Sequence, residues 1–317
     1  MTLAGRFDDR GMRFTEIRDH VLGDPGGTPV LLIHGFTVDH RLLLPLDGAF
    51  ARSSESWWRH YIDLPGFGAS AAGPEIDGAD ALARAVEDYV DAQFGDAPFA
   101  VVGSSLGGAL ARHVACSMPD RMLGVCLLVP SVVPLATRDR PAPIRFDEDR
   151  TLLSELPDAD RAAYEEMAVD LTRDNWERYR EAALPGIRAY DRSVAARIYA
   201  DFTLNTEPES LLSAPIDSPS LLVTARQDAV VGYTDQMRLL PHYRRMALVV
   251  ADRAGHNVHI DRPELVQGAL ADWVDRMERE HPEGETPTDA TRASVRTSTA
   301  SGGWNSPASA EGDAPHA

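Results

Sequence analysis

The segment Phe99-Ala-Val-Val-Gly103-Ser-Ser105-Leu-Gly107-Gly-Ala-Leu110 decides the fold that this sequence predicts. It places a Gly-x-Ser-x-Gly pattern between an apolar run and a segment with the composition of a helix. The run predicts a buried strand, so Ser105 stands at a sharp turn from a strand into a helix. Glycine is needed at 103 and 107 because a side chain there would collide with the neighbouring strand or helix. Such a turn lifts the Ser105 hydroxyl clear of the backbone, which makes it the candidate nucleophile.

Short apolar runs and helix-like segments alternate on both sides of this turn. We expect a mostly parallel central sheet flanked by helices, which is an α/β fold, because buried parallel strands read as continuous apolar runs. An antiparallel edge hairpin is expected from 13–17 and 20–22. The predicted strands are 30–33, 60–64, 99–102, 125–129, 221–224 and 247–250, and the predicted helices are 79–93, 106–117 and 263–278.

The alternation stops between residues 132 and 215, where the chain is charged and has no good strand. An inserted helical cap is expected there, over the edge of the sheet at which α/β proteins bind ligands; a helical layer packed elsewhere is the alternative. The predicted cap helices are 159–172, 175–184 and 192–204. The expected domains are a core at 1–131 and 216–278, the cap at 132–215, and a disordered tail at 279–317, which is poor in apolar residues.

A serine hydroxyl attacks a carbonyl efficiently only if a base removes its proton, and His256 is the candidate base. It lies in Ala-Gly-His-Asn, in a loop between the predicted strand 247–250 and the last helix. That loop can bring an imidazole over Ser105. His259 is the local alternative. Activity should fall at acid pH, where a protonated imidazole no longer accepts the serine proton.

The third group required is a carboxylate that orients the imidazole, and Asp228 is the candidate. It follows the predicted strand 221–224, and Asp235 is the alternative. The chain order Ser105, Asp228, His256 is the order expected when such a triad stands on an α/β sheet.

Acyl transfer also needs two backbone N–H groups that stabilise the oxyanion. Leu106, directly after the nucleophile, supplies one candidate. Phe36 supplies the other from the loop after the strand 30–33, with Gly35 allowing close approach and His34 orienting the loop. A direct role of His34 as a second base is the alternative.

These motifs resemble those of the α/β-hydrolase superfamily over residues 12–278. His34-Gly35-Phe36 resembles its oxyanion loop, Gly255-His256 its base loop, and Asp63-Leu-Pro-Gly-Phe-Gly-Ala-Ser70 a structural turn after the next strand. The resemblance implies a serine hydrolase of the capped esterase or carbon–carbon hydrolase type. Relatives that open epoxides or remove halides carry aspartate at the position of Ser105, so the resemblance argues against both activities.

Two departures from the family pattern leave the identity of the substrate undetermined. Position 104 is Ser where relatives often carry His or Asn, and position 225 is Ala where Gly is usual. The central prediction is a carboxylesterase or lactonase acting on a small to medium apolar acyl substrate. The alternatives are a carbon–carbon hydrolase of dienoic keto acids, a non-hydrolytic cyclase or lyase, and a ligand receptor.

Side chains of the predicted cap have two alternative roles, in the substrate pocket or in packing. Its aromatic residues could line an apolar pocket, but packing among the helices is the favoured interpretation. Arg188 and Arg192 could bind a substrate carboxylate, although salt bridges within the cap are favoured. The aromatic residues are Trp176, Tyr179, Tyr190, Tyr199 and Phe202.

Composition excludes several chemistries. The 317 residues contain no lysine, which rules out a lysine Schiff base and a phosphate-loop lysine. Cys116 and Cys126 are the only cysteines, and we expect buried, inert thiols rather than a disulfide framework or a cysteine-rich metal site. The sequence therefore predicts no cofactor and no metal.

Charge and hydropathy limit the classes of partner that the chain can bind. A formal net charge of −18 disfavours binding to nucleic acid or to an anionic membrane surface. No stretch is apolar enough for a membrane span, and the charged first ten residues do not form a signal peptide. We expect a cytoplasmic protein, a monomer or homodimer, with a small-molecule substrate.

Overall fold

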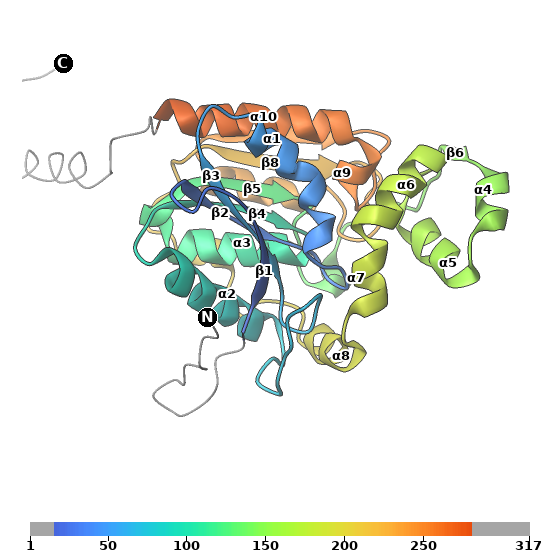
Figure 1. Cartoon of the computed structure of the whole chain (residues 1–317), viewed down its shortest axis with the longest axis horizontal. Coiled ribbons are helices and arrows are strands. Elements are labelled where there is room, and N and C mark those ends of the chain that lie inside the picture. The colour runs from blue at the N-terminus through green and yellow to red at the C-terminus, as the bar shows by residue number, and fades with distance from the viewer. Residues whose placement is uncertain (1–15, 281–317) are drawn as a thin grey trace, which may run out of the picture. The chain divides into compact units, whose positions relative to one another are not determined.

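The computed structural model describes residues 16–280, and a seven-stranded sheet forms their centre (Figure 1). The strand order is β1-β3-β2-β4-β5-β8-β9, and every neighbouring pair is parallel except β1 with β3. The predicted α/β fold with a mostly parallel sheet is confirmed. The strands are β1 Arg18–Gly23, β2 Thr28–Ile33, β3 Trp57–Asp63, β4 Phe99–Ser104, β5 Met122–Leu128, β8 Ser220–Ala225 and β9 Met246–Ala251.

The edge strand β1 is antiparallel as expected, and it pairs with β3 in the register Arg18 to Asp63. Of the predicted hairpin partner 13–17, Glu16 and Ile17 belong to no strand, and positions 13–15 lie outside the described residues. The sequence indicated an antiparallel edge strand but did not select β3 as its partner.

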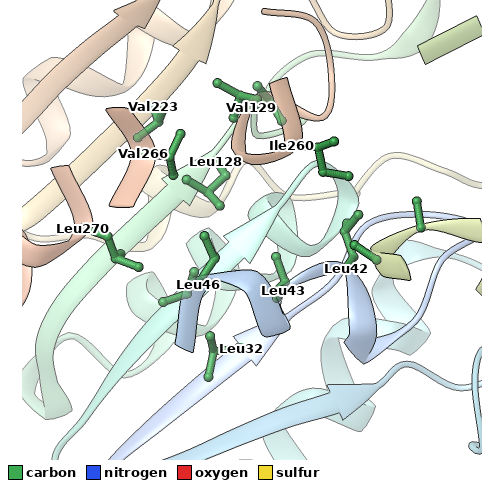
Figure 2. Packing of buried hydrophobic residues seen from close by; sticks show 14 of the residues in the cluster. Leu32, Leu42, Leu43, Leu46, Leu128, Val129, Val223, Ile260, Val266 and Leu270 are labelled. Atoms are coloured by element: carbon green, nitrogen blue, oxygen red, sulfur yellow. The ribbon is translucent and has the colours of Figure 1, made fainter. Parts of the chain in front are cut away.

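Successive residues of the central strands face opposite sides of the sheet, which creates two apolar clusters. Leu32 of β2 and Val102 of β4 belong to the cluster that also holds Leu270. Leu31 and Val101, one position earlier, belong to the cluster on the other side. Figure 2 shows side chains of the first cluster, Leu32 and Leu270 among them. The core therefore extends through the sheet to both faces.

Helices cover both faces of the sheet (Figure 1). The helices α1 Asp47–Ala51, α9 Val258–Asp261 and α10 Pro263–Glu280 supply residues to the first cluster, and α2 Ala79–Phe94 and α3 Leu106–Ser117 supply the second. α10 extends two residues beyond the predicted 278, so the expected tail does not begin at 279. Residues 281–317, where disorder was predicted, lie outside the described residues.

The predicted insertion is helical but is divided differently from the prediction. The expected helix 159–172 ends at Met167, and the chain then becomes extended, with Phe146 N–H donating to the Val169 carbonyl at 2.9 Å. The statement that this region has no strand is therefore wrong, because two short strands pair here in parallel. The elements are β6 Asp147–Glu148, α4 Arg150–Glu155, α5 Asp158–Met167, β7 Asp170–Leu171, α6 Arg173–Ala182, α7 Leu184–Ala189 and α8 Arg192–Ala200.

Two further expectations concern the cysteines and membrane-spanning helices. Cys116 and Cys126 are free and buried, and burial raises the pKa of both thiols, so neither is a reactive thiolate at neutral pH. Between residues 16 and 280, no helix has the length and apolar character needed to cross a membrane.

Candidate active site

Ser105 stands at the turn between β4 and α3. Its backbone has φ +56°, a left-handed conformation that side-chain-bearing residues rarely adopt. Two backbone bonds maintain it: Ser105 N–H donates to the Leu128 carbonyl at 3.0 Å, and Ser131 N–H donates to the Ser105 carbonyl at 2.9 Å. The last residue of β5 and the segment after it thus hold the strained turn in place.

The glycines on either side of Ser105 are required by close packing. A Cβ at Gly103 would lie 2.2 Å from the carbonyl oxygen of Gly107, and one at Gly107 would lie 2.1 Å from that of Ile33. Both distances are far inside van der Waals contact. The sheet and helix α3 approach so closely that no side chain fits between them.

The structure brings Ser105, His256 and Asp228 together. His256 Nδ1 lies 2.9 Å from Asp228 Oδ2, and His256 Nε2 lies 2.8 Å from Ser105 Oγ. Because a carboxylate only accepts, Nδ1 carries the proton, and Nε2 is free to accept from the serine hydroxyl. The three residues follow strands β4, β8 and β9, whose carboxyl ends meet at one edge of the parallel sheet.

Asp228 is buried and oriented by its own loop. Its Oδ1 accepts from the N–H groups of Val230 at 2.8 Å and Val231 at 3.0 Å, which leaves Oδ2 facing His256. The alternative carboxylate, Asp235, is engaged elsewhere. It accepts from Asp139 N–H at 2.9 Å and lies 3.3 Å from an Arg238 nitrogen.

The alternative histidine, His259, is buried below the base loop rather than beside the serine. Its Nε2 lies 2.8 Å from the Leu42 carbonyl, so this nitrogen carries a proton and donates. Burial lowers its pKa to about 4. His259 is therefore a neutral packing residue at physiological pH.

His34 hydrogen-bonds to the backbone of the loop after β2 and of the residue after β3. Its Nδ1–H donates to the Gly35 carbonyl at 2.6 Å, and its Nε2 accepts from Leu64 N–H at 2.9 Å. Burial lowers its pKa, so the imidazole is neutral. With both ring nitrogens bound to backbone, His34 has no free nitrogen to act as a second base.

The two predicted oxyanion donors remain free within residues 16–280. Neither Phe36 N–H nor Leu106 N–H donates to a protein acceptor there. Leu106 begins α3, where the first N–H groups have no intrahelical partner and favour negative charge. Phe36 shares a small cavity with Ser105. Both donors are therefore available to a ligand atom.

A model of the alpha/beta hydrolase fold family matches residues 28–263. The chain belongs to the α/β-hydrolase fold family. The predicted fold class and enzyme family are confirmed by this match. A crystal structure of an alpha/beta superfamily hydrolase from Oenococcus oeni PSU-1 has the same fold, with a TM-score of 0.75 and 24% identity, covering 87% of this chain and all of that one.

Curated relatives of this chain carry two kinds of name. Pimeloyl-(acyl-carrier protein) methyl ester esterases of Neisseria meningitidis and Chromobacterium violaceum are 25% and 37% identical over 252 and 121 residues. These matches cover 78% and 37% of this chain and 93% and 42% of the relatives. A 2-succinyl-6-hydroxy-2,4-cyclohexadiene-1-carboxylate synthase of Salmonella paratyphi B is 36% identical over 110 residues, or 35% of this chain and 40% of that one. The chain thus spans less than half of two of these relatives.

The turn after β3 is structural in this chain. Asp63 Oδ1 accepts from the backbone and ring N–H of His40 at 2.9 and 2.8 Å, and Oδ2 accepts from Ala69 N–H at 2.8 Å. Asp39, His40 and Asp63 lie close enough to hold a metal ion. Their ligand atoms are already used, however, because Asp39 binds Arg41 as well, and these bonds explain the cluster without a cation.

A buried carboxylate that the sequence did not indicate supports the loop of His256. Asp261 Oδ2 accepts from Gly255 N–H at 2.8 Å, next to His256, and its Oδ1 accepts from Asn175 Nδ2 of α6 at 2.8 Å. Burial raises the pKa of Asp261 to about 6. Its position five residues after His256 was the available signal, but only the packing of α6 against α9 shows its partner.

Two cavities meet at the candidate site. The inner cavity, about 40 Å³, is the one that Ser105 and Phe36 line, together with Ser104 and Tyr179. The outer cavity is about 380 Å³ and lies against Ile144, Arg145, Glu165, Glu166, Gln227 and Val230. His256 and Met167 line both cavities. Position 104, where this chain departs from the family pattern, therefore contributes to the inner wall.

The aromatic and basic side chains of the insertion mostly pack against one another. Trp176 and Tyr179 are buried and their rings contact that of Tyr164. Arg188 forms a salt bridge with Asp160 at 2.5 Å, as favoured from the sequence. Arg192 likewise lies over the Tyr190 ring within the insertion. The exceptions are Tyr199 and Phe202, whose rings contact that of Phe36 in the loop after β2.

Proposed function

We propose that the chain is a serine hydrolase that cleaves a carboxylic ester or lactone with a small to medium apolar acyl group. The observation that carries the proposal is the hydrogen-bonded chain from Ser105 Oγ through His256 to Asp228. A serine in this arrangement is activated by a base whose tautomer is set by a carboxylate.

In the proposed mechanism, Ser105 Oγ attacks the carbonyl carbon while His256 Nε2 takes its proton. The N–H groups of Phe36 and Leu106 stabilise the oxyanion, and Asp228 stabilises the imidazolium. The imidazolium then protonates the leaving oxygen, and an acyl-enzyme remains. Water, deprotonated by the same imidazole, releases the acid.

Support also comes from the insertion and from the relatives. We propose that residues 132–215 form the cap, because Met167 and Tyr179 of this segment line the cavity of Ser105. The Neisseria relative, which is covered almost throughout, bears the name of an ester esterase. The acyl substrate in that name belongs to that protein and is not transferred to this chain.

A panel of p-nitrophenyl esters of increasing acyl length tests the proposal. The wild type should hydrolyse short esters and be labelled by a fluorophosphonate. Ser105→Ala should abolish labelling and lower kcat by about 10⁴-fold or more, with an unchanged far-UV circular dichroism spectrum. Undiminished turnover by the folded variant would contradict the proposal.

The Salmonella synthase match favours a second candidate, a non-hydrolytic lyase or cyclase that uses the same serine and histidine. Labelling of Ser105 by the fluorophosphonate without turnover of any ester would select this candidate. Turnover of simple esters that depends on Ser105 would select the esterase.

A further inference from the structure

The two cavities differ in size in a way that restricts the substrate. A volume of about 380 Å³ lies within the range of small-molecule binding pockets, whereas about 40 Å³ admits only a few atoms. Of these two cavities, only the outer one can therefore hold a substantial part of the substrate. The question is whether that part is the acyl group or the alcohol group of the ester.

Proton transfer decides between the two groups. When the acyl-enzyme forms, the bond from Ser105 Oγ to the acyl carbon is made and the bond from that carbon to the alcohol oxygen breaks. The electron pair of the broken bond goes to the alcohol oxygen, which takes the proton held on His256 Nε2. The alcohol portion must therefore lie on the His256 side of the reacting carbon.

The lining residues place the outer cavity on that side. His256 lines both cavities, whereas Ser105 and Phe36, the nucleophile and a candidate oxyanion donor, line only the inner one. The acyl carbon and its oxyanion consequently belong to the inner cavity. His256 and Met167 are the residues that line both cavities, so the outer cavity adjoins the inner one at His256.

The charge of the outer cavity restricts the alcohol portion further. Arg145 lies 3.9 Å from Glu165, so these two charges offset each other. Glu166 has no ion-pair partner among the residues described here, and the whole chain carries −18. A negatively charged group in this cavity would be repelled, while the walls contributed by Ile144 and Val230 are apolar.

We infer that this hydrolase prefers esters with a short acyl group and a large, uncharged or cationic alcohol group, which occupies the outer cavity. The inference rests on the proposed ester hydrolysis and adds the orientation of the substrate. Met167, which lies between the two cavities, limits the length of the acyl group.

Two isomeric esters test the orientation. Hexyl acetate and methyl heptanoate have the same formula and similar hydrophobicity but place the long chain on opposite sides of the carbonyl. Initial rates measured in a pH-stat should give a kcat/KM at least about tenfold higher for hexyl acetate, because one misplaced methylene already costs this much. An equal or inverted ratio would overturn the inference.

Met167→Ala supplies a gain of activity that a merely structural role would not produce. Opening the wall should raise the ratio of kcat/KM for methyl heptanoate to kcat/KM for hexyl acetate about fivefold or more. Ile144→Ala should instead lower kcat/KM for hexyl acetate alone. Leu211→Ala is the matched control, because Leu211 is 49% exposed, like Ile144 at 47%, and lines neither cavity. A parallel loss on both esters in the Met167 variant would overturn the assigned role.

Charge is tested with acetylcholine and its neutral analogue 3,3-dimethylbutyl acetate. Glu166→Gln should lower the ratio of kcat/KM for acetylcholine to kcat/KM for the neutral ester by roughly two- to fivefold, as expected for an exposed charge. If the variant shows no selective loss on acetylcholine, the proposed charge preference is wrong. Turnover of p-nitrophenyl acetate separates the failures: if it persists while the isomer ratio is inverted, only this inference fails, and if no ester is cleaved, the proposed function fails with it.

Discussion

His259 makes the folded protein sensitive to acid in a way that can be calculated. The buried imidazole donates from Nε2 to the Leu42 carbonyl, and its Nδ1 has no hydrogen-bond partner within the described part of the chain. A proton added at Nδ1 would create a buried charge whose N–H has no acceptor. This is why burial lowers the pKa from an ordinary 6.5 to about 4.

The sign follows from proton binding. Below pH 6.5 the unfolded chain takes up a proton at this histidine, while the folded chain does not until about pH 4. The contribution of His259 to the free energy of unfolding is therefore present in full above pH 6.5. It is lost as the pH falls from 6.5 through 4. The loss is about 2 kcal/mol between pH 7.5 and 5, and about 3 kcal/mol at its limit.

Urea unfolding of the wild type and His259→Gln at pH 7.5 and 5 measures this effect. Glutamine can donate to the same carbonyl but does not titrate, so the variant should lose about 2 kcal/mol less on acidification. Asp261 acts with the opposite sign, because a carboxyl with a folded pKa of about 6 favours folding as it is protonated. It is present in both proteins and cancels. Equal losses in the two proteins would refute the reasoning.

Two further substitutions have predictable costs. Asp228→Asn should lower kcat on p-nitrophenyl acetate by about 10³–10⁴-fold with little change in melting temperature, because the imidazole loses the partner that sets its tautomer; a loss under tenfold would contradict this role. Arg112→Met should lower the free energy of unfolding by about 3–5 kcal/mol, since the buried Arg112 donates from Nε to Glu209 at 2.8 Å and its loss leaves that carboxylate unpaired. The double variant with Glu209→Leu should recover most of the loss in chemical denaturation, and a loss as large as that of the single variant would contradict this account.

Local patterns carried the prediction of the fold and of the central residues. Ser105 lies in a pattern whose glycines are required by close contacts with Ile33 and with helix α3. The pattern therefore predicts the turn directly. His256 and Asp228 were found because each follows a strand whose carboxyl end reaches the same sheet edge. In these cases a short segment contains its own structural reason.

The residues that were missed depend on contacts between distant segments. Asp261 and Asn175 are 86 positions apart and meet only because α6 packs against α9. Met167 ends a helix that was predicted to continue, and the extended residues that follow it pair with another short segment of the insertion. Neither contact leaves a periodic or compositional signal, so the sequence does not reveal the division between the two cavities.

Identification of the acyl-enzyme is the most direct test of the account. The wild type, mixed with a p-nitrophenyl ester and quenched in acid within milliseconds, should carry up to one acyl group per chain, mapped by peptide mass spectrometry to Ser105. The same experiment with Ser105→Ala should give no acylated peptide. An acyl group on another residue, or sustained turnover by Ser105→Ala, would contradict Ser105 as the nucleophile.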